Sequence, residues 1–139
     1  MTTRAELSAA EEYGHGHTPL MRAALDGNTE RVKELIHRGA DINQRDDNGR
    51  TALMFAVINT HYETMKVLLE YGADVNVKSN EGGTALMGAA LAGDLRMVQA
   101  LLDKGADVHP RLTETNESAV TLAARHGHAE IARLLSQFN

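Results

Sequence analysis

Seven histidines are the residues of this chain that could bind a metal ion, and four of them form two His-x-His pairs. The pairs are His15 with His17 and His126 with His128. A zinc site needs three or four converging ligands, and one such pair in a glycine-rich loop supplies at most two. Because the pairs stand near opposite ends of the chain, we expect structural or exposed histidines, with no metal site and no cofactor.

Three other segments partly match ion-binding or catalytic motifs and lack their essential residues. The acidic segment Asp41–Gly49 has Arg45 at the third ligand position of a calcium loop, and no glutamate closes it. The glycine-rich points at 14–16 and 82–83 lack the Lys-Ser/Thr pair of a phosphate-binding loop. Ser118 is placed as a helix N-cap, so we expect no catalytic triad and no enzyme.

The composition limits the class of protein. A chain of 139 residues fits one domain, and its net charge of −5, with no adjacent basic residues, argues against nucleic-acid binding. The absence of cysteine excludes disulfides and thiolate metal sites. The first residues lack the apolar core of a signal peptide, and no stretch approaches the ~20 apolar residues of a spanning helix. We therefore expect a cytoplasmic protein that does not bind membranes.

The secondary-structure elements that position these residues are predicted from motifs that recur at a fixed spacing. Thr-Pro-Leu-Met at Thr18–Met21 returns as Thr-Ala-Leu-Met at Thr51–Met54 and at Thr84–Met87, each 33 residues after the last. Gly-Ala-Asp returns at the same spacing, at residues 39–41, 72–74 and 105–107. A fixed period of this length is typical of a stacked array of small structural units.

Each period predicts two helices and a loop. Thr51 is a good N-cap for a first helix, in which apolar residues recur at helical spacing. Gly27 marks the break after the equivalent helix one period earlier, and Asn28 is a strong cap for the second helix. Gly39 suits the left-handed end of that helix, and a polar turn then leads to the next copy.

The fourth copy carries one inserted residue. Asp41 precedes Thr51 by ten positions, whereas Asp107 precedes Ser118 by eleven. Ser118 keeps the capping role of the threonine. Asn116 stands where Gly49 stands in an earlier copy, and asparagine tolerates the left-handed conformation. We therefore expect the fourth copy to keep the same fold.

These recurring motifs resemble those of the ankyrin repeat family over about residues 16–139. The matching residues are the Thr-Pro-Leu and Thr-Ala-Leu starts, the paired alanines, "GHAEIARLL" at Gly127–Leu135, and "GADIN" or "GADVN" at Gly39–Asn43 and Gly72–Asn76. The resemblance implies an all-α repeat solenoid, a stack of helix-turn-helix units with β-hairpin-like loops, here called fingers. We place the repeats at about 16–48, 49–81, 82–115 and 116–139. For residues 1–15 we predict a capping helix or a flexible lead.

The chain departs from the family at one recurring place. The family's histidine after Thr-Pro-Leu, which hydrogen-bonds neighbouring loops, is replaced by Met21, Met54, Met87 and Thr121. We expect flexible methionine packing in place of those bonds. The methionines should not share a metal ion, because stacked helices lie ~8–10 Å apart. The methionines and the lack of cysteine resemble bacterial members of the family more than animal ones.

One repeated aliphatic position, here called the aliphatic row, is not explained by helix formation alone. Leu25, Ile58 and Leu91 stand 33 residues apart, and Arg125 takes the place in the fourth copy. In the resembled family this position and the next face the concave groove used for binding. With their flanks and the fingers, these residues form the predicted partner-binding set: Leu25, Asp26, Arg45, Asp47, Asn48, Arg50, Ile58, Asn59, Lys78, Asn80, Glu81, Leu91, Arg111 and Arg125.

The predicted function is binding of a protein or peptide partner by a monomeric, non-catalytic array. Three alternatives stay open. The row could instead complete the packing between repeats. The chain could be a structural or inhibitory subunit of a larger complex. It could also bind a metal or a small ligand through its histidine-rich ends.

Overall fold

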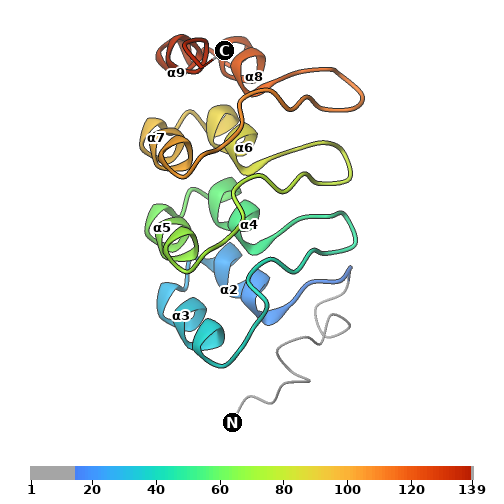
Figure 1. The fold of residues 1–139 in the computed structure, drawn as a ribbon, viewed down its shortest axis with the longest axis vertical. Coiled ribbons are helices and arrows are strands. Elements are labelled where there is room, and N and C mark those ends of the chain that lie inside the picture. Colours follow the sequence, from blue (N-terminus) through green and yellow to red (C-terminus); the bar gives the residue numbers. More distant parts are fainter. Residues whose placement is uncertain (1–14, 139) are drawn as a thin grey trace.

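The computed structural model describes residues 15–138, which form eight helices in two columns (Figure 1). Residues 1–14 of the predicted capping segment lie outside the described residues. The inner column holds α2 (Pro19–Asp26), α4 (Ala52–Ile58), α6 (Ala85–Ala92) and α8 (Ala119–Arg125). The outer column holds α3 (Thr29–His37), α5 (Tyr62–Glu70), α7 (Leu95–Asp103) and α9 (Ala129–Leu135). Residues 15–138 contain no strand, so the predicted all-α repeat stack is confirmed.

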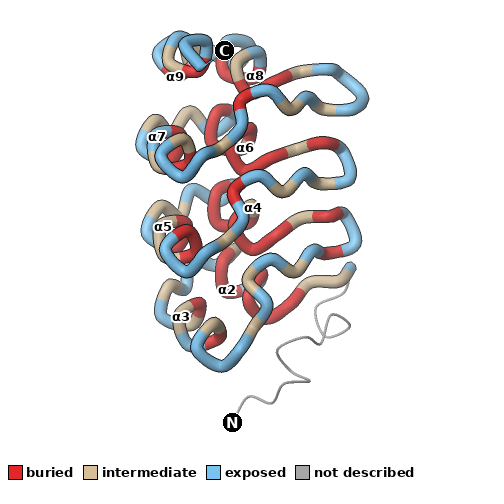
Figure 2. Tube along the Cα trace, viewed as in Figure 1, coloured by how far each residue is buried: buried red, intermediate tan, exposed pale blue. Residues whose placement is uncertain are grey.

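The core lies between the two columns and along the inner column. Consecutive inner helices pack on one another, and each also packs on the outer helix that follows it. Ala24, Ala56 and Ala90 are fully buried in the inner column, where their small side chains allow close approach. The buried segments follow this column and the turns that face it, while the fingers are largely exposed apart from buried points such as Asp46, Gly49 and Gly82 (Figure 2). Leucine, valine, methionine and alanine build this core, as the low aromatic content requires.

Hydroxyl N-caps begin the inner helices, as the sequence predicts. The side-chain oxygens of Thr18, Thr84 and Ser118 each accept a hydrogen bond from the backbone N–H three residues on. Thr51 has the same extended backbone, but its buried hydroxyl has no partner within the described part of the chain. Three of the four caps therefore satisfy an N–H group that the helix leaves unpaired.

The fingers project from the inner column on the side away from the outer column (Figure 1). Each is closed by one backbone hydrogen bond of 2.8–2.9 Å, from Asp46 to Arg50, Ser79 to Gly83, and Leu112 to Glu117. The last pair is one residue wider, which places the inserted residue in the finger tip. Asn116 has φ 61°, so the predicted left-handed asparagine is confirmed.

The methionine row does more than pack. Met21 and Met87 are buried, and Met54 is half-buried against the core. The Met21 sulfur also accepts a hydrogen bond from the Thr18 N–H at 3.4 Å, and Thr121 Oγ1 accepts the equivalent bond from Ser118 at 2.7 Å. The Met21 sulfur thus completes a capping box within its own helix start, in addition to the methionine packing that the sequence predicts.

Candidate binding surface

The aliphatic row lies at the C-terminal ends of three inner helices. Ile58 ends α4 with 62% of its surface exposed, and Leu91 stands one residue before the end of α6 with 43% exposed. Leu25 of α2 is half-buried and packs against the core. Packing between repeats therefore accounts for Leu25 alone. Ile58 and Leu91 leave large apolar surfaces in water on successive repeats.

Side chains of the following repeat hold the backbone of this row. The Leu25 carbonyl oxygen accepts a hydrogen bond from Asn59 Nδ2 at 2.9 Å and lies 3.0 Å from His61 Nε2. The Leu91 carbonyl oxygen lies 3.1 Å from His128 Nε2. These contacts hold the Leu25 and Leu91 carbonyls, whereas no side chain among the described residues holds the Ile58 carbonyl in this way; they also give Asn59, a predicted partner contact, a role between repeats.

Two glycines make room for the histidines. A Cβ atom at Gly27 would meet the His61 ring, and one at Gly93 would meet the His128 ring. Both glycines are left-handed, with φ near +70° to +76°, and they end α2 and α6. His128 therefore has the structural role that the sequence predicts. The equivalent role of His61 could have been found from its position 34 residues after Gly27.

The fingers are joined edge to edge by residues predicted as partner contacts. Arg45 Nη2 donates to the Lys78 carbonyl oxygen at 2.6 Å. Asn80 donates through its backbone N–H to the Asn48 oxygen at 2.9 Å, and through Nδ2 to the Asp47 oxygen at 3.0 Å. The next finger repeats the pattern, with a 2.9 Å bond from Thr113 N–H to the Glu81 oxygen. These bonds hold the fingers as one surface.

A buried carboxylate, which the sequence did not single out, organises the first finger. Asp46 accepts hydrogen bonds from the Asn48 N–H, the Arg50 N–H and Arg50 Nε at 2.8–3.0 Å. His17 Nε2 lies 3.2 Å from Asp46 Oδ2, near enough for an ion pair although not aligned as a hydrogen bond. The Arg50 guanidinium stacks 4.9 Å from the centre of the Phe55 ring. Arg50, a predicted contact, is thus held at the base of its finger.

The family is shown by comparison with known sequences. The family model for ankyrin repeats (3 copies) matches residues 4–79 and 76–139. The chain belongs to the ankyrin repeat family. No curated protein matches the chain. Ankyrin repeats are generally protein–protein interaction modules, and the family is typically non-catalytic.

Among the remaining predicted contacts of the ankyrin array, some charged side chains have ion-pair or hydrogen-bond partners and others have none. Asp26 pairs with Arg22 at 3.2 Å, and Arg125 pairs with Glu117 at 2.6 Å. Arg111 Nη1 donates to the Asn116 oxygen at 2.9 Å. Within residues 15–138, the exposed Lys78 ammonium has neither an ion pair nor a hydrogen bond. The exposed Asp47 and Glu81 carboxylates also form no ion pair or side-chain hydrogen bond within this range, so the predicted set keeps uncommitted charges of both signs.

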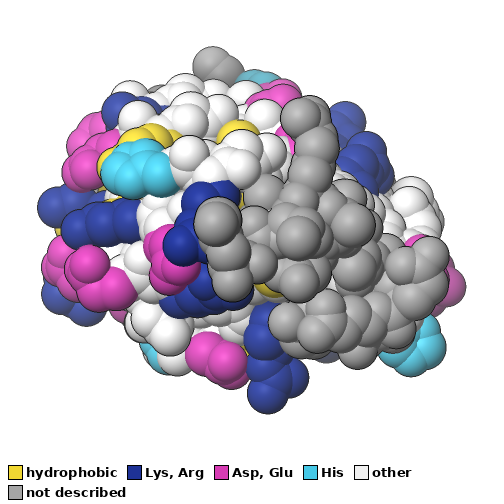
Figure 3. Space-filling view, turned by 90° about the horizontal axis from the view of Figure 1, so that it is seen from below, with side chains coloured by type: hydrophobic (Ala, Val, Ile, Leu, Met, Phe, Trp, Pro, Cys, Tyr) yellow, Lys and Arg dark blue, Asp and Glu magenta, His cyan; other side chains and the backbone are white. Residues whose placement is uncertain are grey.

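Figure 3 shows one end of the ankyrin stack, where side chains of both charges are exposed. Basic and acidic side chains alternate on its visible part, and little hydrophobic surface shows there. Within residues 15–138, no three His, Asp or Glu side chains come together as a metal site needs. None of the helices in this range combines the length and apolar character that crossing a bilayer requires.

Proposed function

We propose that the chain is a non-catalytic binding module whose partner, a protein or a peptide, contacts Ile58 and Leu91. The observation that carries the proposal is the exposure of these two aliphatic side chains, 62% and 43%, on adjacent repeats. Exposed apolar surface that recurs in a row suits a binding role, because burying it against a partner releases about 25 cal/mol per Å².

The rigidity of the surroundings supports this proposal. Histidine and asparagine contacts to the Leu25 and Leu91 carbonyl oxygens hold two positions of the row, and hydrogen bonds between fingers hold the finger loops. A surface that is ordered before binding loses less conformational entropy when a partner docks. We propose Lys78, next to the second finger, as a charged contact of the partner, because its ammonium has no ion pair or hydrogen bond within the described residues.

The experiment is affinity capture from a lysate of the source organism with the wild-type chain and with the Ile58→Glu, Leu91→Glu double variant. The double variant should stay folded by circular dichroism and lose the captured proteins, since two charges would enter an apolar contact. Phe138→Glu is the matched control, because Phe138 is an apolar residue of similar exposure, 44%, outside the row. Recovery of the same proteins by the double variant would show that the row is not the site.

A separate outcome concerns the alternative of internal packing. If the double variant unfolds while Phe138→Glu remains folded, the two side chains belong to the core and the proposal is wrong. If the captured proteins include an enzyme that the wild-type chain inhibits, the same surface serves an inhibitory subunit. We propose a monomeric, cytoplasmic module, and light scattering of the purified chain tests the monomer.

A further inference from the structure

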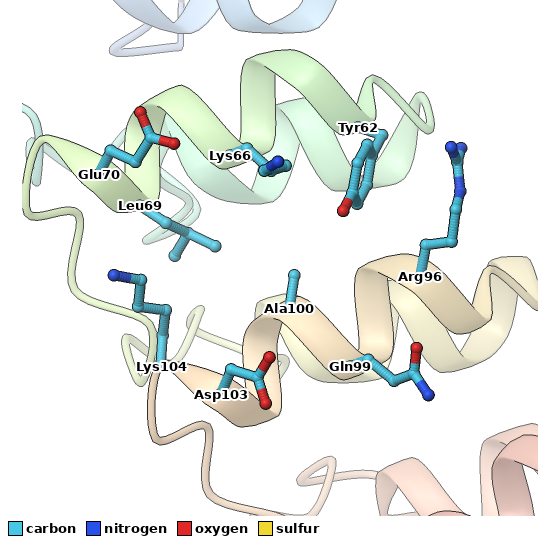
Figure 4. A pocket seen from close by; sticks show the side chains of 9 residues that line it. All are labelled: Tyr62, Lys66, Leu69, Glu70, Arg96, Gln99, Ala100, Asp103 and Lys104. Carbon is cyan, nitrogen blue, oxygen red and sulfur yellow. The ribbon is translucent and has the colours of Figure 1, made fainter.

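The outer column contains a groove that shares no residue with the aliphatic row. It lies between α5 and α7, measures about 430 Å³, and is lined from α5 by Tyr62, Lys66, Leu69 and Glu70 (Figure 4). The α7 wall includes Arg96, Ala100 and Asp103. The volume lies in the range of sites that hold a small ligand or a short peptide segment.

Side-chain hydrogen bonds join the helices of the neighbouring seam, whereas at the α5–α7 seam the Arg96 guanidinium lies over the Tyr62 ring. Between α3 and α5, the Thr29 and Thr64 hydroxyls lie 2.8 Å apart, and His37 Nε2 lies 3.1 Å from the Tyr71 hydroxyl. One repeat on, 33 residues later, the two pairs become Tyr62 with Met97 and Glu70 with Lys104. No side-chain hydrogen bond or ion pair joins α5 to α7 among the described residues.

One end of the groove is cationic. The Arg96 guanidinium lies 4.4 Å from the centre of the Tyr62 ring, and the Lys66 ammonium lies 5.4 Å from it. Figure 4 shows the Tyr62 ring between these two cations. Tyr62 begins α5 and Arg96 lies in the first turn of α7, so both cations lie near helix N-termini, where Glu63 of α5 and the N-cap Asp94 of α7, 3.8 Å from Arg96 Nε, also stand. Lys66 has no ion pair among the described residues, so its ammonium is the group at this end that can take up a carboxylate.

The other end carries carboxylates, and the floor between is apolar. Glu70 and Asp103 stand near the C-terminal ends of α5 and α7, with Lys104 beside them. Leu69 is buried and Ala100 half-buried, and both face the groove between its two ends (Figure 4). From Arg96 to Asp103 the helix rises about 10 Å at 1.5 Å per residue. The groove thus presents cations at one end, then an apolar floor, then two carboxylates together with the Lys104 ammonium at the other end.

Arg96 pairs with Asp94 at 3.8 Å, but the other four charges that line this groove have no ion pair among the described residues. These four are Lys66, Glu70, Asp103 and Lys104. The α3 helix differs, because its charges pair along its own length: Arg31 with Glu34, Lys33 with Glu30, and Arg38 with Glu34. The α5–α7 groove therefore lies at a seam without an interhelical side-chain hydrogen bond or ion pair among the described residues, and four of its lining charges, of both signs, are unpaired.

We propose that the α5–α7 groove is a second binding site, for an extended segment of a partner protein that carries an acidic, an aliphatic and a basic residue at alternate positions. Alternate side chains of an extended segment point the same way and lie about 6.6 Å apart. The acidic side chain meets Lys66, the aliphatic one covers Leu69 and Ala100, and the basic one meets Glu70 and Asp103. A chain with this site and the aliphatic row bridges two partners.

The test is an amide NMR titration of the full chain with the peptide Ac-Gly-Ser-Glu-Ser-Leu-Ser-Lys-Ser-Gly-NH2. Residues of α5 and α7 should shift, and a peptide with glutamine in place of both charged residues should bind at least about threefold more weakly. Lys66→Glu should weaken binding of the charged peptide about three- to tenfold, and 0.5 M salt should also weaken it. Lys33→Glu, at the equivalent place on α3, is the control and should leave the affinity unchanged.

Three results would overturn the inference. They are equal binding of the charged and neutral peptides, shifts outside α5 and α7, and concentration-dependent shifts of α5 and α7 without peptide, which would assign the groove to a second copy of this chain. The Ile58→Glu, Leu91→Glu variant should bind the peptide normally. Failure of the proposed function at the aliphatic row is therefore distinguishable from failure at this groove.

Discussion

At the scale of single residues, two repeat boundaries share a histidine and glycine pair that the middle boundary lacks. The His61 ring occupies the space over Gly27, and the His128 ring occupies the space over Gly93. At the equivalent places between the second and third helix pairs, the chain has Thr60 and Asp94. The histidine ring, with its contact to the carbonyl oxygen of Leu25 or Leu91, is thus present at the first and third repeat boundaries and absent at the second.

The substitution Gly93→Ala tests this pair. Alanine costs about 1 kcal/mol at any left-handed position, and at Gly93 its Cβ would also collide with the His128 ring. Gly127→Ala is the control, because Gly127 is also left-handed, with φ 80°, and has open space where the Cβ would be. In urea titrations, Gly93→Ala should lower the free energy of unfolding more than Gly127→Ala. Equal losses would contradict the collision, and in a His128→Ala background the difference should disappear.

At the scale of elements, the inner helices begin alike in sequence but not in hydrogen bonding. Thr84 Oγ1 accepts the Met87 N–H at 3.2 Å, whereas the buried Thr51 hydroxyl has no partner within residues 15–138. Burying an unpaired hydroxyl costs free energy, while a formed cap lowers the energy of the helix end. The same residue type at the same repeat position therefore contributes differently to stability.

Replacing each threonine by valine, which has the same shape, measures that difference. Thr84→Val should lower the free energy of unfolding by about 1 kcal/mol, because it removes a formed cap. Thr51→Val should cost less or should stabilise, because it removes a buried hydroxyl without a partner. Urea midpoints of the two variants give the comparison, and a larger loss at Thr51 would show that its hydroxyl is hydrogen-bonded in solution.

At the scale of the whole molecule, sequence periodicity predicted the stack because each helix pair repeats the same local chemistry. Caps, breaks and the left-handed Asn116 depend on neighbours within a few positions, so a single sequence shows them. The contact between Asn80 and Asp47 joins residues 33 apart, and such partners depend on how the fingers meet. The absence of a side-chain hydrogen bond between α5 and α7 among the described residues likewise depends on what faces Tyr62 and Glu70 from the next repeat. Those features required the three-dimensional arrangement.

The stack also predicts where the array opens first. Stability in a repeat array is close to a sum of units and interfaces between neighbours. The α4 and α6 helices each bury five residues, whereas α8 buries three, and Ala124 of α8 is exposed where Ala90 of α6 is fully buried. Hydrogen exchange should therefore show protection in α8 and α9 about tenfold or more below that in α4 and α6. Uniform protection across the four inner helices would instead mean that the array unfolds as one cooperative unit.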